Sequence, residues 1–267
     1  MRKRPPVAAL LFAVASAASA QCSASDGPDG IDSVYTEHLT QVLKRWAPLR
    51  ADVTPAAREA GSVAITCVAT IGSERYVGMI QRQRIQAALT MVEEVLDDID
   101  HYKDLFPGTI DVRVVPGSLR LVPGTPPAAR FDTAWVQRPP IFLMPDIHYE
   151  MANLVEKTPA RAVYRYKLRL GDVLTASDGL IVVEAIDSTT TEFTEYDFFD
   201  GHWGLLPTWL VWRESLKGAF QSDVAIRLKA EQPAWDYLRI AAEAERLASL
   251  ESKRFERCFA DRRAVLR

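Results

Sequence analysis

Short runs of alternating or β-branched residues, each closed by a turn signal, fill residues 109–199 and constrain the fold more than any other feature. Pairs such as Pro116-Gly117 end the runs. The predicted strands lie at 110–115, 119–122, 130–136, 141–149, 162–170, 180–186 and 192–199. Because connections this short join neighbouring strands of opposite direction, the pattern predicts an antiparallel sheet.

Two further strands are predicted upstream, at residues 61–71 and 76–86, where Val, Ile and Thr are frequent or apolar and polar residues alternate. The spacing of apolar residues then changes from that of a strand to that of a helix. Apolar residues recur every three or four positions from Leu89 to Tyr102, and Pro107-Gly108 ends the pattern. This segment is expected to form one helix or two short ones.

Longer helices are predicted towards both ends of the chain. An amphipathic pattern covers residues 32–47, a helix of residues 206–229 begins around Pro207, and another of residues 235–259 follows Pro233. Strands followed by helices, rather than alternating with them, indicate the α+β class.

The first twenty residues have the pattern of a cleavable secretory signal, with Arg2, Lys3 and Arg4, an apolar run, and Ala18-Ser19-Ala20. Cleavage is expected after Ala20, followed by a polar leader at residues 21–31. No later run approaches the roughly 20 apolar residues of a membrane-spanning helix. The sequence therefore predicts a periplasmic or secreted protein without a transmembrane segment.

Charge excludes one class of partner. Loss of the three N-terminal cations lowers Lys+Arg from 32 to 29 against 35 acidic residues, which moves the net charge from -3 to -6. No basic footprint for nucleic acid is present. Cys22, Cys67 and Cys258 are too few for a disulfide framework, and one bridge or small buried thiols both remain open.

Catalytic and metal-binding motifs are missing from the sequence. It has no G-x-S-x-G, H-E-x-x-H, C-x-x-C, G-x-G-x-x-G or P-loop pattern. The histidines, His38, His101, His148 and His202, are scattered over four predicted elements. The acids around His101, such as Asp97, are expected on a solvated helix face. No metal site and no cofactor are predicted.

Three segments carry a resemblance to a known superfamily. Residues 92–107 resemble the helix pair of START-like and polyketide cyclase-like (SRPBCC) proteins, Ser177-Asp178-Gly179 before residues 180–184 resembles their late hairpin, and residues 205–228 resemble their long helix. The resemblance implies a helix-grip fold, in which a curved antiparallel sheet wraps around a long C-terminal helix and leaves a cavity. It covers residues 76–229, so residues 32–75 and 230–267 are interpreted as N- and C-terminal extensions.

Aromatic residues crowd the last predicted strand, its loop and the long helix. In a helix-grip fold, some of these side chains line the ligand pocket. The candidates are Trp203, Trp209, Trp212, Leu216 and Phe220. Ordinary core packing is the alternative. Arg130 and Glu184 are candidates to bind a polar head group. A charged residue of a strand costs free energy if it points into the protein without a partner, so such a residue often has a function. The alternative is that both residues face water on the outer side of the sheet.

Weak catalytic candidates are Tyr196, Asp197 and His202, which lie close together near the expected cavity mouth. A histidine there suits proton transfer, and ordinary turn hydrogen bonds are the alternative. The loop at residues 200–205, with Gly201 and Gly204, is the expected gate.

Three functions follow from the predicted fold. The favoured one is an exported protein that holds a lipid or other hydrophobic small molecule without covalent chemistry. The second is a cyclase- or dehydratase-type enzyme on the same fold. The third is an envelope interaction protein with a filled interior, which docks through its added helices.

Overall fold

A computed structural model describes residues 59–71, 74–139, 141, 144–202, 204 and 206–260. The predicted signal, leader and helix at residues 1–47, together with Cys22 and Trp203, lie outside the described residues, as do the side chains of Cys67, Trp209 and Cys258.

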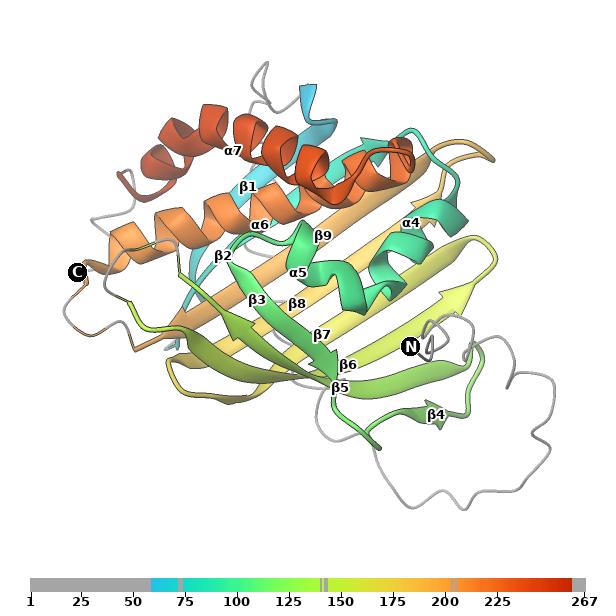
Figure 1. Ribbon diagram of the computed structural model, residues 1–267, viewed down its shortest axis with the longest axis horizontal. Helices are drawn as coiled ribbons and strands as arrows, with labels where there is room; N and C mark the ends of the chain where they lie inside the picture. The colour runs from blue at the N-terminus through green and yellow to red at the C-terminus, as the bar shows by residue number, and fades with distance from the viewer. Residues whose placement is uncertain are drawn as a thin grey trace.

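The core of the structure is one curved antiparallel sheet of nine strands (Figure 1). The strands are β1 (Ser62–Ile71), β2 (Glu74–Ile85), β3 (Thr109–Val114), β4 (Arg120–Val122), β5 (Ala128–Gln137), β6 (Ile147–Thr158), β7 (Arg161–Gly171), β8 (Leu174–Ala185) and β9 (Thr191–Gly201). Their order is β1-β2-β9-β8-β7-β6-β5-β3, and β4 pairs with β5. The last strand thus pairs with the second, while strands β5 to β9 form a meander.

Helices cover the concave side of this sheet. A broken segment, α4 (Leu89–Asp97), η1 (Ile99–His101) and α5 (Tyr102–Leu105), follows β2. The long helix α6 (Thr208–Glu231) crosses the sheet, and α7 (Tyr237–Ala260) runs back along α6 (Figure 1). This arrangement is the predicted helix-grip architecture. No helix in the described part of the chain is both long and apolar enough to cross a membrane.

Two predicted strand boundaries were wrong. Ile141 and residues 144–146, the described residues of the segment, are not part of a strand, because Met144 N donates to Ile141 O in a turn and β6 begins only at Ile147. Ser177-Asp178-Gly179 is not a loop but lies within β8, where Gly179 pairs with Tyr166 and Asp197 on the neighbouring strands. Turn-type residues are tolerated there because both edges of β8 are hydrogen-bonded by other strands.

The two sides of helix α6 carry different residues. Trp212, Leu216 and Phe220, spaced four apart, are buried, and the Phe220 ring lies 5.9 Å from that of Phe255 on α7. Residues at this spacing share one side of a helix, so the bulky side packs towards α7. The cavity-facing side includes four small residues, Ser215, Gly218, Ala219 and Ser222, beside larger ones such as Lys217, Gln221 and Ile226. Space therefore remains between α6 and the sheet.

Candidate functional site

A cavity of about 730 Å³ fills the space between the concave face of the sheet and α6. Its walls come from alternate residues of the strands, which point to one face of a sheet. On β5 these are Phe131, Thr133, Trp135 and Gln137. The segment from α4 to α5 closes one side with Leu96, Ile99, Tyr102 and Phe106.

Four aromatic rings form one wall of this cavity. The Phe106 and Trp135 rings are stacked with centroids 6.3 Å apart, and Trp135 stacks on Tyr149 at 5.8 Å. Tyr102 lies 4.5 Å from Phe106 and 5.9 Å from Trp135. Trp135 Nε1 donates to Thr133 Oγ1 at 2.9 Å, which satisfies its polar edge. The result is an aromatic, largely apolar wall that can contact a hydrophobic ligand.

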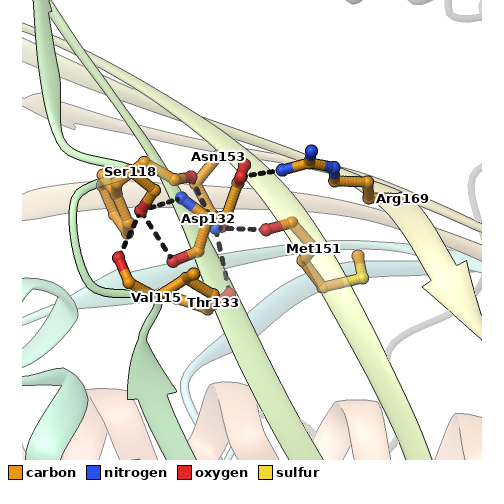
Figure 2. A network of polar contacts seen from close by, with 8 residues as sticks. Val115, Ser118, Asp132, Thr133, Met151, Asn153 and Arg169 are labelled. Carbon is orange, nitrogen blue, oxygen red and sulfur yellow. Dashed lines mark hydrogen bonds and ion pairs between the residues drawn. The ribbon is translucent and has the colours of Figure 1, made fainter.

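Asn153 fixes the polar part of the same wall (Figure 2). Its side-chain nitrogen lies within hydrogen-bonding distance of Thr133 Oγ1 and of the backbone oxygens of Phe131 and Met151. On the other side of β5, Asp132 forms an ion pair with Arg169, while Ser118 Oγ accepts a hydrogen bond from the Asp132 backbone N–H (Figure 2). Odd residues of β5 therefore face the cavity and even residues face outwards.

Three carboxyl groups gather at another part of the lining. Glu195 and Asp197 come from β9, and Asp223 comes from α6. The Tyr166 hydroxyl lies 3.0 Å from Glu195 Oε1 and 3.2 Å from Asp197 Oδ1. Asp223 is fully buried and shares a hydrogen bond with the Glu195 carboxyl, while no basic or amide group of the described residues donates to its oxygens. These acids form the acidic cluster of the cavity.

Burial shifts the protonation of the acidic cluster. It raises the pKa of Asp197 to about 7, with a further rise from the charges of Glu195 and Asp178, against a hydrogen bond from Tyr166 that lowers it. Burial and the neighbouring Glu195 raise the pKa of Asp223 well above its ordinary value. Asp197 and Asp223 therefore retain protons in the pH range where exposed carboxyls have lost them.

Other half-buried acids of the lining have basic partners. Asp97 pairs with Lys157 at 2.5 Å and accepts a hydrogen bond from the Tyr164 hydroxyl at 3.2 Å. Glu214 pairs with Arg213 at 2.5 Å. Asp97 is thus not on the solvated face that the sequence predicted, because β6 supplies Lys157 beside the helix.

Gly179 makes room for the tyrosine that contacts the acidic cluster. A Cβ atom at position 179 would lie 1.7 Å from Cζ of the Tyr166 ring, which crosses this position on the neighbouring strand. Only glycine lets the ring lie flat on β8, and this placement brings the hydroxyl to Glu195 and Asp197.

Gly179→Ala is therefore expected to displace the Tyr166 ring and to lower the free energy of unfolding by about 1–3 kcal/mol, the usual cost of overpacking. Chemical denaturation would measure the loss. Because the clash involves one ring, the double variant Gly179→Ala/Tyr166→Ala should be less destabilised than the sum of its single variants. A Gly179→Ala protein as stable as the wild type would contradict this account.

The structure separates the predicted catalytic candidates. Asp197 lines the cavity, but Tyr196 points to the opposite face, where it packs on Val163 and Leu180. His202 is exposed and is not among the lining residues. Tyr196 and Asp197 cannot share a site because consecutive residues of a strand face opposite sides.

The predicted ligand-binding residues that the structure describes lie away from the cavity. Trp212, Leu216 and Phe220 are in the core on the side of α6 that faces α7. Arg130 is an even residue of β5, so it lies on the outer face, and Glu184 is half-exposed and pairs with Arg161 at 3.0 Å.

Sequence reasoning missed the aromatic wall and Asp223. The two-residue alternation of Phe131, Thr133 and Trp135 is a signal that could have identified the inner face of β5. Asp223 had no such signal, because an acid on a helix usually faces water. No group of three His, Cys, Asp or Glu side chains suited to a metal occurs in the described part of the chain.

The strand order and the position of α6 define the fold: a curved antiparallel sheet wraps around a long helix in the helix-grip arrangement. No protein-family model matches the sequence, and no curated protein matches it either.

Solved structures similar to this one share little sequence with it. The Zhui aromatase/cyclase from Streptomyces sp. R1128 is 17% identical, with a TM-score of 0.39, over 64% of this chain and 94% of that chain. A STAR-related lipid transfer protein from Xanthomonas axonopodis is 14% identical, with a TM-score of 0.45, over 62% and 99%. The human StarD13 lipid transfer and protein localization domain is 12% identical, with a TM-score of 0.42, over 78% and 100%.

Proposed function

We propose that this protein is exported and binds a lipid or another hydrophobic small molecule in the cavity between the sheet and α6, where it carries or sequesters that molecule. The observation that supports this most directly is the cavity itself. Its volume of about 730 Å³ falls within the roughly 300–1,000 Å³ of small-molecule sites, and its walls are largely apolar and aromatic.

Apolar burial supplies enough free energy for such binding. A ligand that buries roughly 300 Å² of apolar surface gains on the order of 7 kcal/mol at about 25 cal/mol per Å². Loss of translational freedom and ordering of side chains reduce this gain. The net free energy from apolar burial of this extent is therefore below about 7 kcal/mol, which corresponds to a Kd above roughly 10 µM.

Gly218 offers the sharpest test because it faces the cavity from the middle of α6. A Cβ atom there would meet only Cγ of Pro107, at 3.7 Å, so alanine fits at ordinary contact distance. Gly218→Trp should fill part of the cavity and weaken binding of a hydrophobic fluorescent probe at least tenfold. Gly218→Ala is the matched control: it should keep probe binding and gain about 0.5–1 kcal/mol of stability from its better helix propensity.

The natural ligand is accessible by extraction of the protein purified from its native host. Mass spectrometry of the organic extract, compared with a mock preparation, should show one enriched compound in about equimolar amount, and Gly218→Trp should lose it. The carrier proposal is wrong if the wild type yields no enriched compound and no hydrophobic probe binds. Equal probe affinity of the tryptophan and alanine variants would place the ligand elsewhere.

A second candidate function is a cyclase- or dehydratase-type enzyme that uses the same cavity. The observation that favours it is Asp197, whose pKa of about 7 and contact with Tyr166 suit proton transfer near neutral pH. Incubation of the extracted compound or its precursor with the protein would distinguish the two, because an enzyme changes the compound and a carrier returns it intact. The third hypothesis required a filled interior, which the structure does not have.

A further inference from the structure

The acidic cluster leaves hydrogen-bond acceptors without donors at the cavity. Asp223 has no exposed surface. Its carboxyl shares a hydrogen bond with that of Glu195, another acid, and no basic or amide group of the described chain donates to its oxygens. Gln81 and Gln83 on β2 use their side-chain nitrogens to donate to Ser62 Oγ and Asp223 O, which leaves both Oε1 atoms without a donor. Buried polar atoms are normally paired. Among the described residues, the acceptors in this part of the molecule therefore outnumber the donors, of which the Tyr166 hydroxyl is one.

The neighbours that shift the protonation of the acidic cluster carry no positive charge. Glu195 and Asp197 influence the carboxyl of Asp223, and Asp178 and Tyr166 influence that of Asp197. The basic residues Arg138, Arg165 and Lys217 also line the cavity. None of the ion pairs between described side chains includes Glu195, Asp197 or Asp223, whereas the lining acids Asp97 and Glu214 have a lysine and an arginine. The cluster thus has the acceptors and the charge of a cation site without a protein cation.

We infer that Glu195, Asp197 and Asp223 bind the protonated amine of an otherwise apolar ligand, an inference that rests on the proposed carrier function and specifies its ligand class. An alkylammonium group brings three N–H donors and a positive charge. It can donate to the oxygens of Asp223, and its charge offsets the repulsion between carboxylates. A carboxylate ligand would be repelled, and an alcohol supplies a single donor.

The aromatic wall lies close enough to the acidic cluster for one ligand to contact both. The charge of Glu195 contributes to the raised pKa of Tyr102, and the charge of Asp197 contributes to that of Tyr149, although burial is the larger cause for both. These two rings belong to the wall that contacts Trp135. An apolar chain can therefore lie on the aromatic wall while its ammonium group contacts the acids, and ring faces also attract cations.

Three probes of equal chain length test the inference: decylamine, decanol and decanoate, each titrated below the concentration at which it aggregates. The wild type should bind decylamine at least tenfold more tightly than decanol, and decanoate most weakly. Affinity for decylamine should rise from pH 5 to pH 8, because the Asp197 carboxyl, with its pKa of about 7, ionises in this interval while the amine stays protonated.

Single substitutions test whether the acidic cluster is the part of the cavity that binds the amine. Asp223→Asn and Asp197→Asn should each lower decylamine affinity about tenfold and change decanol affinity less than threefold. Glu214→Gln, which removes a lining acid that already has a basic partner, is the matched control and should change neither. Melting temperatures would show that each variant is folded.

The outcomes separate this inference from the function on which it rests. If decanol or decanoate binds as tightly as decylamine, the cavity holds hydrophobic ligands but the amine assignment is wrong. If none of the three binds, and Gly218→Trp matches Gly218→Ala, the carrier function itself fails. Loss of decylamine binding in Glu214→Gln alone would move the cation site away from the acidic cluster.

Discussion

Phe220→Ala is expected to lower the free energy of unfolding by about 3–5 kcal/mol and to leave probe binding nearly unchanged in the folded protein. Phe220 is fully buried in the apolar core and contacts Phe255 on α7, so its removal leaves a void between two long helices. Large-to-small substitutions in cores cost this much because the surroundings collapse only partly. Chemical denaturation and a probe titration well below the midpoint would measure both quantities.

Trp135→Ala is the comparison variant, because it removes a ring of the cavity wall rather than a ring of the core. Trp135 is half-buried in the cavity wall and stacks on Phe106 and Tyr149, so its loss should weaken probe binding at least tenfold and cost less stability than Phe220→Ala. The assignment of the two faces of α6 would be overturned if Phe220→Ala abolished binding at a temperature where the protein is folded and Trp135→Ala did not.

Stability is expected to fall as the pH rises from 5 to 8. The folded-state pKa of Asp197, about 7, exceeds the roughly 3.9 of an unfolded aspartate. Between these values the folded state holds a proton that the unfolded state has lost, so folding is favoured at low pH. This contribution is complete below about pH 4 and is lost as the pH rises through 7. For one such group, linkage gives a loss of about 2–3 kcal/mol between pH 5 and pH 8.

Asp197→Asn should remove most of this pH dependence, because asparagine does not titrate. Denaturation midpoints at pH 5 and pH 8 would measure it, with Glu214→Gln as the control that should keep the wild-type slope. Asp223→Asn should act in the same direction, since burial also raises the Asp223 pKa. If wild-type stability instead rose between pH 5 and pH 8, the carboxyls would not be buried as the structure has them.

The secondary structure and the class of fold were predictable from the sequence. Alternation and turn signals predicted the strands that became β5, β7 and β9, and the change to a period of three or four predicted the segment from α4 to α5. These patterns are local, because each reports how one element divides its residues between an apolar and a polar side. The helix-grip fold was predicted from the resemblance of three segments to START-like and polyketide cyclase-like proteins.

The site was mostly not predictable, and α6 shows why. Its aromatic residues indicated that one face of the helix is buried. Either a ligand pocket or a neighbouring helix can cover such a face. In the structure, Phe220 packs on Phe255 of α7. A pattern along one helix shows that a side is buried and not which neighbour buries it. Arg130 and Glu184 were ambiguous for a similar reason, since the alternation of a strand does not say which face is concave.

What the sequence determined by itself was therefore the set of elements and their polar and apolar sides. Only the tertiary structure decided which residues share the cavity. Strand register sets Gly179 beside Tyr166, and α6 brings Asp223 to Glu195, which is 28 positions earlier in the chain. Such contacts depend on strand pairing and helix packing between segments that are distant in the sequence. The spacing of residues along a single element therefore does not predict the acidic cluster.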